Sequence, residues 1–231
     1  MSMKIRTVGF TGAGHGKAGH ARGFTTIELL IVMAISLTTA AVAIPGYLSM
    51  TRYLRIAGDA RDLNGLTAQA KMRAAQDFTH ARLHANLTAN TFQLEIWDKT
   101  GNGGAGCWKT ENDNANPCTS QSNSPVQSLS QGVSFGFGTV GAAAPNPQTI
   151  IAQAPACTTG VAGGTPGSTI ASTACIEFNS RGVPVSASGS PTASDAVYVT
   201  DSNTVYGVTV MISGMMQDWY ANASTTAWQA R

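Results

Sequence analysis

The chain has 231 residues, and only 11% of them are charged, against about 25% in an ordinary globular protein. This low charge excludes a charged disordered chain and a nucleic-acid binder that works by bulk electrostatics. A mean hydropathy of zero excludes a polytopic membrane protein, and the length suits one domain with an appendage.

The N-terminal region changes from basic to apolar. Residues 1–23 contain no acid, whereas 24–44 are apolar or small for 21 residues with Glu28 as the only charge. At about 1.5 Å per residue such a helix measures about 31 Å, which is one bilayer core. We therefore expect a single membrane span, with the basic side in the cytoplasm and the rest outside it. The basic residues are Lys4, Arg6, Lys17 and Arg22.

The order of these segments is not that of an ordinary signal peptide, because the small residue Gly23 precedes the apolar stretch. The segment GFTTIELLIVMAIS, residues 23–36, resembles the cleavage site of type IV prepilins and type II secretion pseudopilins. The resemblance implies that prepilin peptidase cuts after Gly23 and methylates Phe24. It also implies that Glu28, fifth in the mature chain, pairs with the amine of a neighbouring subunit. Pro45 and Gly46 stand where such pilins kink the helix.

Glu28 is expensive in hydrocarbon, where a carboxylate costs about 2.5–3.5 kcal/mol. Cleavage before Phe24 creates a positive amine four residues away, one helical turn, and this amine can neutralise the carboxylate. The alternative is that Glu28 merely snorkels to the nearby interface. We favour a role in assembly.

Residues 46–77 are expected to continue as an amphipathic helix, because apolar or small residues recur every three or four positions. Gly58 and Gly65 each lower helix stability by about 1 kcal/mol relative to Ala, so this helix needs a sheet to pack on. The apolar stripe consists of Ile56, Ala60, Leu63, Leu66 or Thr67, Ala70 and Ala74.

Residues 78–231 are predicted to form a β-rich globular domain. Its strands are expected at 78–87 and 91–97, as a hairpin, and then at 132–137, 149–152, 174–178, 196–200 and 204–213. The fold class is therefore α+β: a long N-terminal helix, membrane-spanning in its first half, packed on a mostly antiparallel β domain. Two long loops, 100–131 and 141–173, are expected to be binding surfaces or covers.

All four cysteines lie beyond the span, and an even number in an oxidising compartment predicts disulfides. Three pairings are possible. We favour Cys107–Cys118 and Cys157–Cys175, because each pair brackets a long loop. A zinc site is the rival interpretation, but there is no C-x-x-C motif and no nearby histidine in the sequence, so no metal is expected.

Three C-terminal segments, 132–138, 174–185 and 196–214, resemble the globular domain of the GspH/FimT pseudopilins. The shared features are a strand, an Asn-Ser-x-Gly turn at 179–182, and two closing strands that end near Gly214 and Trp219. The resemblance implies a low-abundance subunit near the tip of a filament.

Catalysis has little support in the sequence. His80 and His84 are interpreted as a surface pair on the hairpin, and Glu95 and Asp98 are too isolated for general acid–base roles. No catalytic residue, cofactor or metal is therefore expected.

Nucleic-acid binding is not expected either. Some FimT-like minor pilins bind DNA through a basic motif that begins at a C-terminal glycine, but residues 214–219 contain no Lys or Arg. Loss of residues 1–23 would leave ten Lys and Arg against twelve Asp and Glu, a formal charge of −2. Phosphate neutralisation supplies most non-specific DNA affinity. Packing or partner contact is expected of Trp219, Tyr220 and Trp228.

The sequence as a whole predicts a cleaved leader at 1–23, a transmembrane helix at 24–45, an amphipathic helix at 46–77 and a β-rich domain at 78–231. It predicts a minor pilin or pseudopilin of a bacterial inner-membrane filament machine, with the globular domain in the periplasm. Expected partners are other pilins or pseudopilins, prepilin peptidase and the inner-membrane assembly platform. We favour type II protein secretion. The alternatives are a type IV pilus subunit, a DNA-capturing minor pilin and a single-span periplasmic enzyme.

Overall fold

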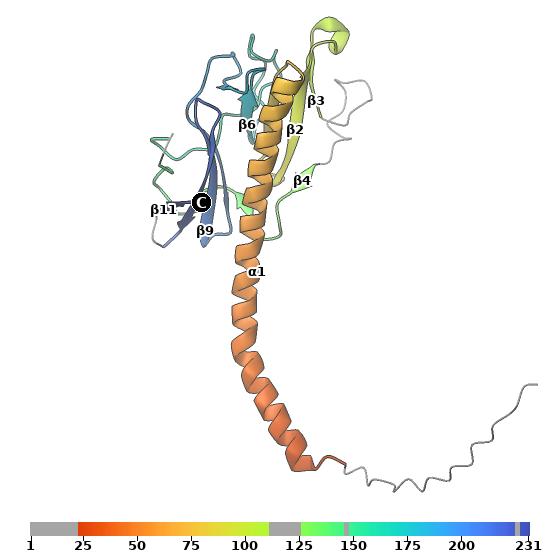
Figure 1. Ribbon diagram of the computed structural model, residues 1–231, viewed down its shortest axis with the longest axis vertical. Helices are drawn as coiled ribbons and strands as arrows, with labels where there is room; N and C mark the ends of the chain where they lie inside the picture. Colours follow the sequence, from red (N-terminus) through yellow and green to blue (C-terminus); the bar gives the residue numbers. More distant parts are fainter. Residues whose placement is uncertain (1–22, 111–125, 146–147, 225–226) are drawn as a thin grey trace, which may run out of the picture. The chain divides into compact units, whose positions relative to one another are not determined.

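The computed structural model describes residues 23–110, 126–145, 148–224 and 227–231 (Figure 1). The cysteine Cys118 lies outside these residues, and so does most of the predicted leader. The chain divides after Gly46 into two compact units. The fold class is α+β, as predicted: one long N-terminal helix, and antiparallel strands.

Helix α1 runs from Thr26 to Gln76 and continues through Pro45. Proline has no N–H, so the carbonyl of Ala41 lacks its usual helical donor at this point. The helix nevertheless does not end there, because it resumes directly with Gly46 and Tyr47. A kink at Pro45 and Gly46 stays a prediction.

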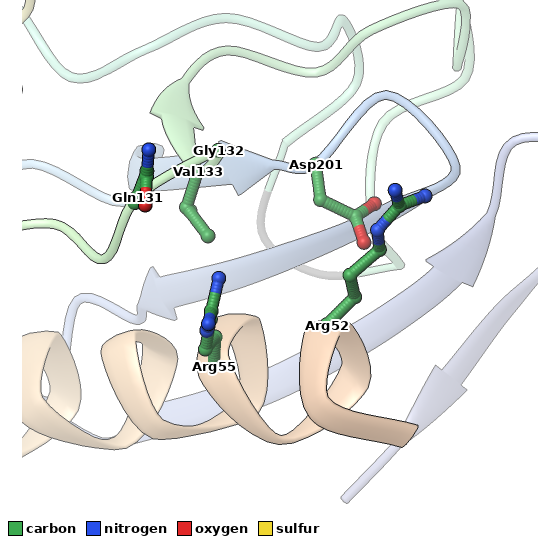
Figure 2. Close-up of a pocket in the computed structure, with 6 residues that line it drawn as sticks. All are labelled: Arg52, Arg55, Gln131, Gly132, Val133 and Asp201. Carbon is green, nitrogen blue, oxygen red and sulfur yellow. The ribbon is translucent and has the colours of Figure 1, made fainter. Parts of the chain in front are cut away.

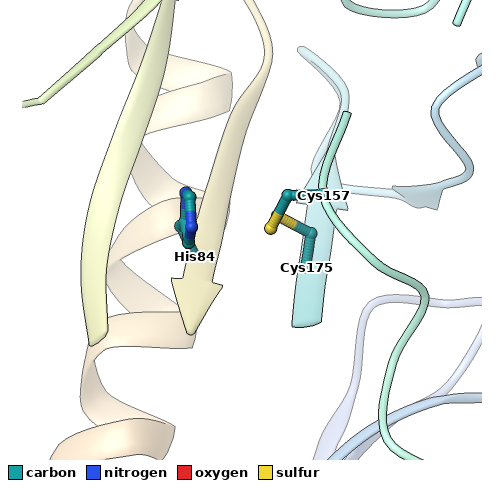
Figure 3. Close-up of side chains that lie close together, drawn as sticks. All are labelled: His84, Cys157 and Cys175. Atoms are coloured by element: carbon teal, nitrogen blue, oxygen red, sulfur yellow. A yellow bond between two sulfur atoms is a disulfide. The ribbon is translucent and has the colours of Figure 1, made fainter. Parts of the chain in front are cut away.

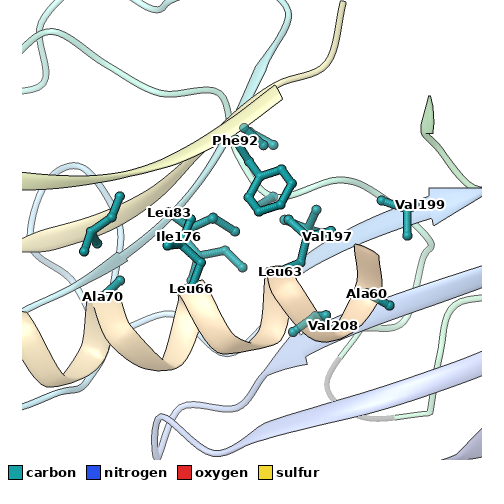
Figure 4. Close-up of a cluster of buried hydrophobic side chains, with 14 of the residues drawn as sticks. Ala60, Leu63, Leu66, Ala70, Leu83, Phe92, Ile176, Val197, Val199 and Val208 are labelled. Atoms are coloured by element: carbon teal, nitrogen blue, oxygen red, sulfur yellow. The ribbon is translucent and has the colours of Figure 1, made fainter. Parts of the chain in front are cut away.

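The second half of α1 buries the predicted stripe (Figure 4). Leu63 and Ala70 are fully buried, whereas Leu54, on another face, is 55% exposed. The stripe joins one hydrophobic core with side chains from both sheets, so the glycine-containing helix gains the sheet support that it needs. The buried positions are Ile56, Ala57, Asp59, Ala60, Leu63, Leu66, Thr67, Ala70 and Ala74.

The first sheet has the order β3-β2-β1-β6-β7, with β4 also paired to β2. Its centre is the predicted hairpin β1–β2, in which Leu83 lies opposite Leu94, with Ile176 of β6 on the other side. Alternation places these three residues on the helix-facing side and puts their neighbours on the opposite, outer face. The strands are β1 Ala81–Asn86, β2 Thr91–Asp98, β3 Cys107–Thr110, β4 Gln127–Ser128, β6 Thr173–Phe178 and β7 Pro184–Val185. A short 3-10 helix, η1 Asn102–Gly104, precedes β3.

The second sheet has the order β11-β10-β9-β8-β5 and is also antiparallel. Val197, Val199 and Val208 face the core that they share with α1. The strands are β5 Ser134–Phe135, β8 Asp195–Thr200, β9 Thr204–Val210, β10 Met216–Asn222 and β11 Trp228–Ala230.

The described residues of the predicted loop 141–173, which are 141–145 and 148–173, form a cover, and their uncharged composition suits that burial. Of these, Ala144 and Ile151 are buried against Tyr198, on the outer face of the second sheet. The strand expected at 149–152 is wrong, because this stretch packs on a sheet face rather than pairing with a strand.

The same loop fastens the two sheets together. The Ala154 N–H donates to Ala196 O of β8 at 2.6 Å, and the Cys175 N–H of β6 donates to Pro155 O at 2.8 Å. The Gln153 amide also bonds both backbone groups of Tyr198, each at 2.9 Å. These bonds satisfy strand-edge groups that would otherwise be unpaired.

Several strands were not expected from the sequence. β10 pairs with β9 over seven residues, but its sequence MQDWYAN alternates weakly and follows a turn at Gly214, whose φ is +73°. β7 begins at Pro184, and a proline is tolerated there because it is the first residue of the strand.

Truncation of the stripe should destabilise the globular unit. Leu63→Ala removes a fully buried side chain, so we expect the free energy of unfolding to fall by about 2–5 kcal/mol. Leu54→Ala, on the same helix but exposed, should change it by less than about 0.5 kcal/mol. Denaturant unfolding of the full chain in detergent micelles measures both. Equal losses would contradict the assigned core.

Candidate functional site

The N-terminus of α1 is a capped helix start. The backbone N–H of Glu28 donates to Thr25 Oγ1 at 3.3 Å, and the Leu29 N–H donates to Thr25 O at 3.1 Å. Thr25 is therefore the N-cap and Glu28 the third helical residue, the spacing of a capping box. This local signal was not recognised in the sequence, although Thr-x-x-Glu was visible there. The cap fixes where the helix begins relative to Gly23 and Phe24.

The side chain of Glu28, unlike its backbone N–H, takes no part in the helix cap. Across the described residues, its carboxylate has no hydrogen-bond or ion-pair partner. It stands in the first turn, where the positive end of the helix dipole favours an acid by about 0.3–1 kcal/mol. Glu28 is thus a free acceptor at the start of an apolar helix, available to a cation that another molecule or a new N-terminus supplies.

The rest of the N-terminal half is apolar and uncovered. Every residue from 23 to 39 is exposed, and Phe24 is 82% exposed. The hydroxyls of Ser36, Thr38 and Thr39 donate within the helix: Ser36 Oγ to Val32 O at 2.7 Å, Thr38 Oγ1 to Ile35 O at 2.9 Å and Thr39 Oγ1 to Ile35 O at 3.0 Å. Such internal bonds suit a surrounding without water.

By length and composition, one helix among the described residues could cross a membrane. It is α1, with an 18-residue window of mean hydropathy 2.3. That finding agrees with the predicted span, or with a signal segment. The exposed side chains form a surface that the described residues do not cover.

A pocket of about 280 Å³ lies in the globular unit, beside the early part of its helix (Figure 2). Arg52 and Arg55 come from α1, Gln131, Gly132 and Val133 from the segment before β5, and Asp201 from the turn between β8 and β9. Asp201 Oδ1 already accepts the N–H groups of Asn203 and Thr204 at 2.9 and 2.7 Å, so it shapes the turn. With two arginines and one acid, the pocket suits an anionic group of a partner better than a cation.

The outer face of the first sheet holds a buried polar network. Arg82 Nε donates to Glu95 Oε2 at 2.7 Å, and Arg82 Nη2 lies 2.6 Å from the same oxygen. Gln93 Nε2 and His84 Nδ1 each lie 2.8 Å from Glu95 Oε1. The guanidinium also donates to Thr158 O and lies 3.9 Å from the centre of the Trp108 ring. From the sequence, His84 was predicted to be a surface residue and Glu95 to be isolated, and both predictions are wrong.

Glu95 is held as an anion by this surrounding. Burial by itself raises the pKa of a carboxyl, but the Arg82 charge and the hydrogen bonds from His84 and Gln93 outweigh burial. Together they lower the pKa of Glu95 to about 2.

The histidines were predicted to form a surface pair, and this is wrong for His84, which is buried. His80 and His84 each contact a carboxylate instead: His80 Nδ1 lies 2.7 Å from Glu177 Oε1, and His84 contacts Glu95. Side chains alternate along the strand, so His80 and His84 both lie on the outer face of the first sheet. Residues 157–163 cover part of this face.

The disulfide Cys157–Cys175 is present, as predicted, and joins the covering loop to β6. His84 lies beside it (Figure 3). No histidine is close to the cysteines in the sequence. In the folded chain His84 is close to them, because the pairing of β1 with β6 sets His84 opposite Cys175. Cys107 begins β3, but the predicted pair Cys107–Cys118 extends beyond the described residues and stays a prediction.

The C-terminal aromatic residues pack within the chain. Trp219 Nε1 donates to Thr209 Oγ1 at 3.0 Å, and Trp228 Nε1 donates to Ala142 O at 2.9 Å. Tyr220 lies against Tyr206, with ring centres 5.1 Å apart. These contacts agree with packing rather than base stacking.

The architecture is pilin-like: a long apolar N-terminal helix whose second half packs on antiparallel sheets. A scan against protein-family models found no match, and searches of the curated proteins and of the solved structures found none either.

Loss of the Glu95 charge should destabilise the fold in a pH-dependent way. Glu95→Gln leaves Arg82 buried without its counter-charge, which typically costs about 3–5 kcal/mol at neutral pH. The folded pKa is about 2, below the unfolded value of 4.5, so the stabilisation is complete above about pH 4.5. It is lost as the pH falls toward 2, and the difference between wild type and variant should shrink over that interval. Unfolding curves from pH 7 to pH 2.5 measure this.

The control for this experiment is Asp62→Asn, which neutralises an exposed carboxylate on α1. It should change stability by less than about 0.5 kcal/mol at every pH. A Glu95→Gln difference that stays constant with pH would contradict the buried ion pair.

Proposed function

We propose that this chain is a minor pilin or pseudopilin, a structural, non-catalytic subunit of a bacterial inner-membrane filament machine. The observation that most supports the proposal is the start of α1. A capped helix begins two residues after Phe24. Within the described part of the chain, the carboxylate in its first turn has no partner and the apolar surface that follows is uncovered. The motif around Gly23 and the pilin-like architecture agree with it.

The proposed mechanism has two stages. In the membrane, the apolar half of α1 is held by burial of its side chains in lipid, each large one contributing about 1.5–3 kcal/mol. In a filament, the same side chains pack against helices of neighbouring subunits. Prepilin peptidase would cut after Gly23, and the new Phe24 amine of one subunit would pair with Glu28 of the next and set the register of docking.

The globular unit then presents its surface to partner subunits and to the inner-membrane assembly platform. The pocket with Arg52 and Arg55 is one candidate contact for an acidic group. Type II protein secretion is the machine that we favour, and a type IV pilus is the alternative. A deletion strain scored for exoprotein secretion, twitching and DNA uptake distinguishes the two.

Processing is the first test. We expect membrane-extracted protein to begin at an N-methylated Phe24, because Gly23 and Phe24 are both exposed ahead of the cap and open to a peptidase. Intact-mass analysis and N-terminal sequencing measure this. Gly23→Val should block cleavage, since the added side chain alters the residue before the cut while the helix start is unchanged. A wild-type chain that keeps residues 1–23, or that begins after Ile44, would contradict the proposal.

The role of Glu28 is the second test. Glu28→Val should leave the helix cap intact, because the cap uses the Glu28 backbone N–H and not the carboxylate. Membrane insertion should be equal or better, since a polar group leaves the span. Assembly should fall, measured as co-purification with other prepilin-type subunits from mildly solubilised membranes.

The matched control for Glu28→Val is Ser36→Val, which also raises the hydropathy of the span but removes no charge. It should assemble normally. Undiminished co-purification of Glu28→Val would leave the carboxylate with only the snorkelling role.

A further inference from the structure

Three potential metal ligands meet on the outer face of the first sheet: a ring nitrogen of His84 and the sulfurs of Cys157 and Cys175. These donor atoms all lie within 4.8 Å of one another. His84 and Cys157 are buried, and Cys175 is half-buried. Two thiolates and one imidazole are a ligand set that Zn²⁺ prefers. In the disulfide the sulfurs are bonded to each other, so the set exists only when the cysteines are reduced.

The orientation of His84 is that of a metal-binding histidine. Its Nδ1 lies 2.8 Å from Glu95 Oε1, the oxygen that also accepts from Gln93 Nε2, so Nδ1 is the nitrogen that donates to it. The lone pair is then on Nε2. A histidine that ligates zinc through one nitrogen almost always donates its other N–H to a carboxylate, a backbone carbonyl or water. Arg82 and Gln93 fix Glu95 in turn.

The backbone around both cysteines is held by bonds that do not depend on the disulfide. The Cys157 N–H donates to Thr173 Oγ1 at 3.0 Å, and Cys157 O accepts from the Ile170 N–H at 2.7 Å. The Cys175 N–H donates to Pro155 O, and Cys175 lies within the β6 ladder. Reduction therefore frees the two sulfurs to turn while the Cα positions, 5.0 Å apart, stay near one another.

We propose that Cys157, Cys175 and His84 bind one Zn²⁺ when the two cysteines are reduced, and that oxidation to the disulfide releases it. Tetrahedral zinc with Zn–S bonds of about 2.3 Å needs sulfurs about 3.8 Å apart, a separation that rotation of the two side chains can supply. A small cavity of about 60 Å³ touches both cysteines and can hold water as the fourth ligand. Two thiolates neutralise the Zn²⁺ charge, so the complex adds no net charge to the buried network.

Release is a balanced two-electron step with a disulfide oxidant, R–S–S–R, as co-reactant. The two zinc-bound thiolates lose two electrons and form the Cys157–Cys175 bond. The S–S bond of the oxidant breaks, and with two protons it gives two R–SH. The Zn²⁺ ion leaves unchanged in oxidation state. Zinc would thus hold the 153–159 loop against the sheet before the disulfide does.

The experiment uses the full chain in detergent micelles, with Cys107→Ser and Cys118→Ser so that other thiols do not bind metal. After reduction with a phosphine, zinc is titrated against a chromophoric chelator, and Co²⁺ is used as the spectroscopic probe. We expect one equivalent of Zn²⁺ and a thiolate-to-Co²⁺ charge-transfer band in the reduced chain. The oxidised chain should show neither.

His84→Gln tests the ligand, because glutamine can still donate an N–H to Glu95 but offers no imidazole nitrogen. Zinc affinity should fall by more than about tenfold. Removal of a residue that only hydrogen-bonds to a metal ligand already lowers metal affinity by about 10–100-fold, and here the ligand itself is removed. His80→Gln is the matched control: the same face and the same kind of carboxylate partner, Glu177, but outside the donor cluster. It should bind zinc as tightly as the parent. No zinc in the reduced parent, or equal affinity in His84→Gln, would overturn the proposal.

Discussion

The structure depends on the packing of one apolar helical stripe against two sheets. Leu63 and Ala70 of α1 share a core with Leu83 of the first sheet and Val197 of the second, so α1 joins the two sheets through this core. The same helix begins with residues that no part of the described chain covers. The apolar side chains of α1 therefore have two roles. Those from Ile56 onward build the core, and the large ones up to Ile44 are exposed and free to contact lipid or another molecule.

The long uncharged loop is the second organising element. Residues 140–145 and 148–155 cover the outer face of the second sheet and pair with strand-edge groups of β8 and β6. Residues 157 and 158 then reach the outer face of the first sheet, where the disulfide and the bond from Arg82 fasten them. A charged loop could not lie in this position, because each charge would need a buried partner such as the one that Arg82 supplies to Glu95.

The sequence predicted the elements that have strong periodicity. The stripe of α1, the hairpin β1–β2 and the strands β6, β8 and β9 follow from alternation and spacing that are visible without a structure. β10 and β11 were missed because their side chains are half-buried and alternate weakly. The environment of His84 was missed for another reason: Glu95 and Cys175 are eleven and 91 positions away in sequence, and only the pairing of β1 with β2 and β6 brings them together.

The second half of α1 belongs to the core, and the central proposal is that the first half is an assembly surface. A photo-crosslinking amino acid placed at Leu30, and in a second strain at Leu63, tests this in native membranes. At Leu30, which is exposed, we expect adducts with the N-terminal helices of other prepilin-type subunits. At Leu63, which is fully buried, we expect adducts only within the chain. Lipid adducts alone at Leu30, in cells that are assembling filaments, would contradict the account.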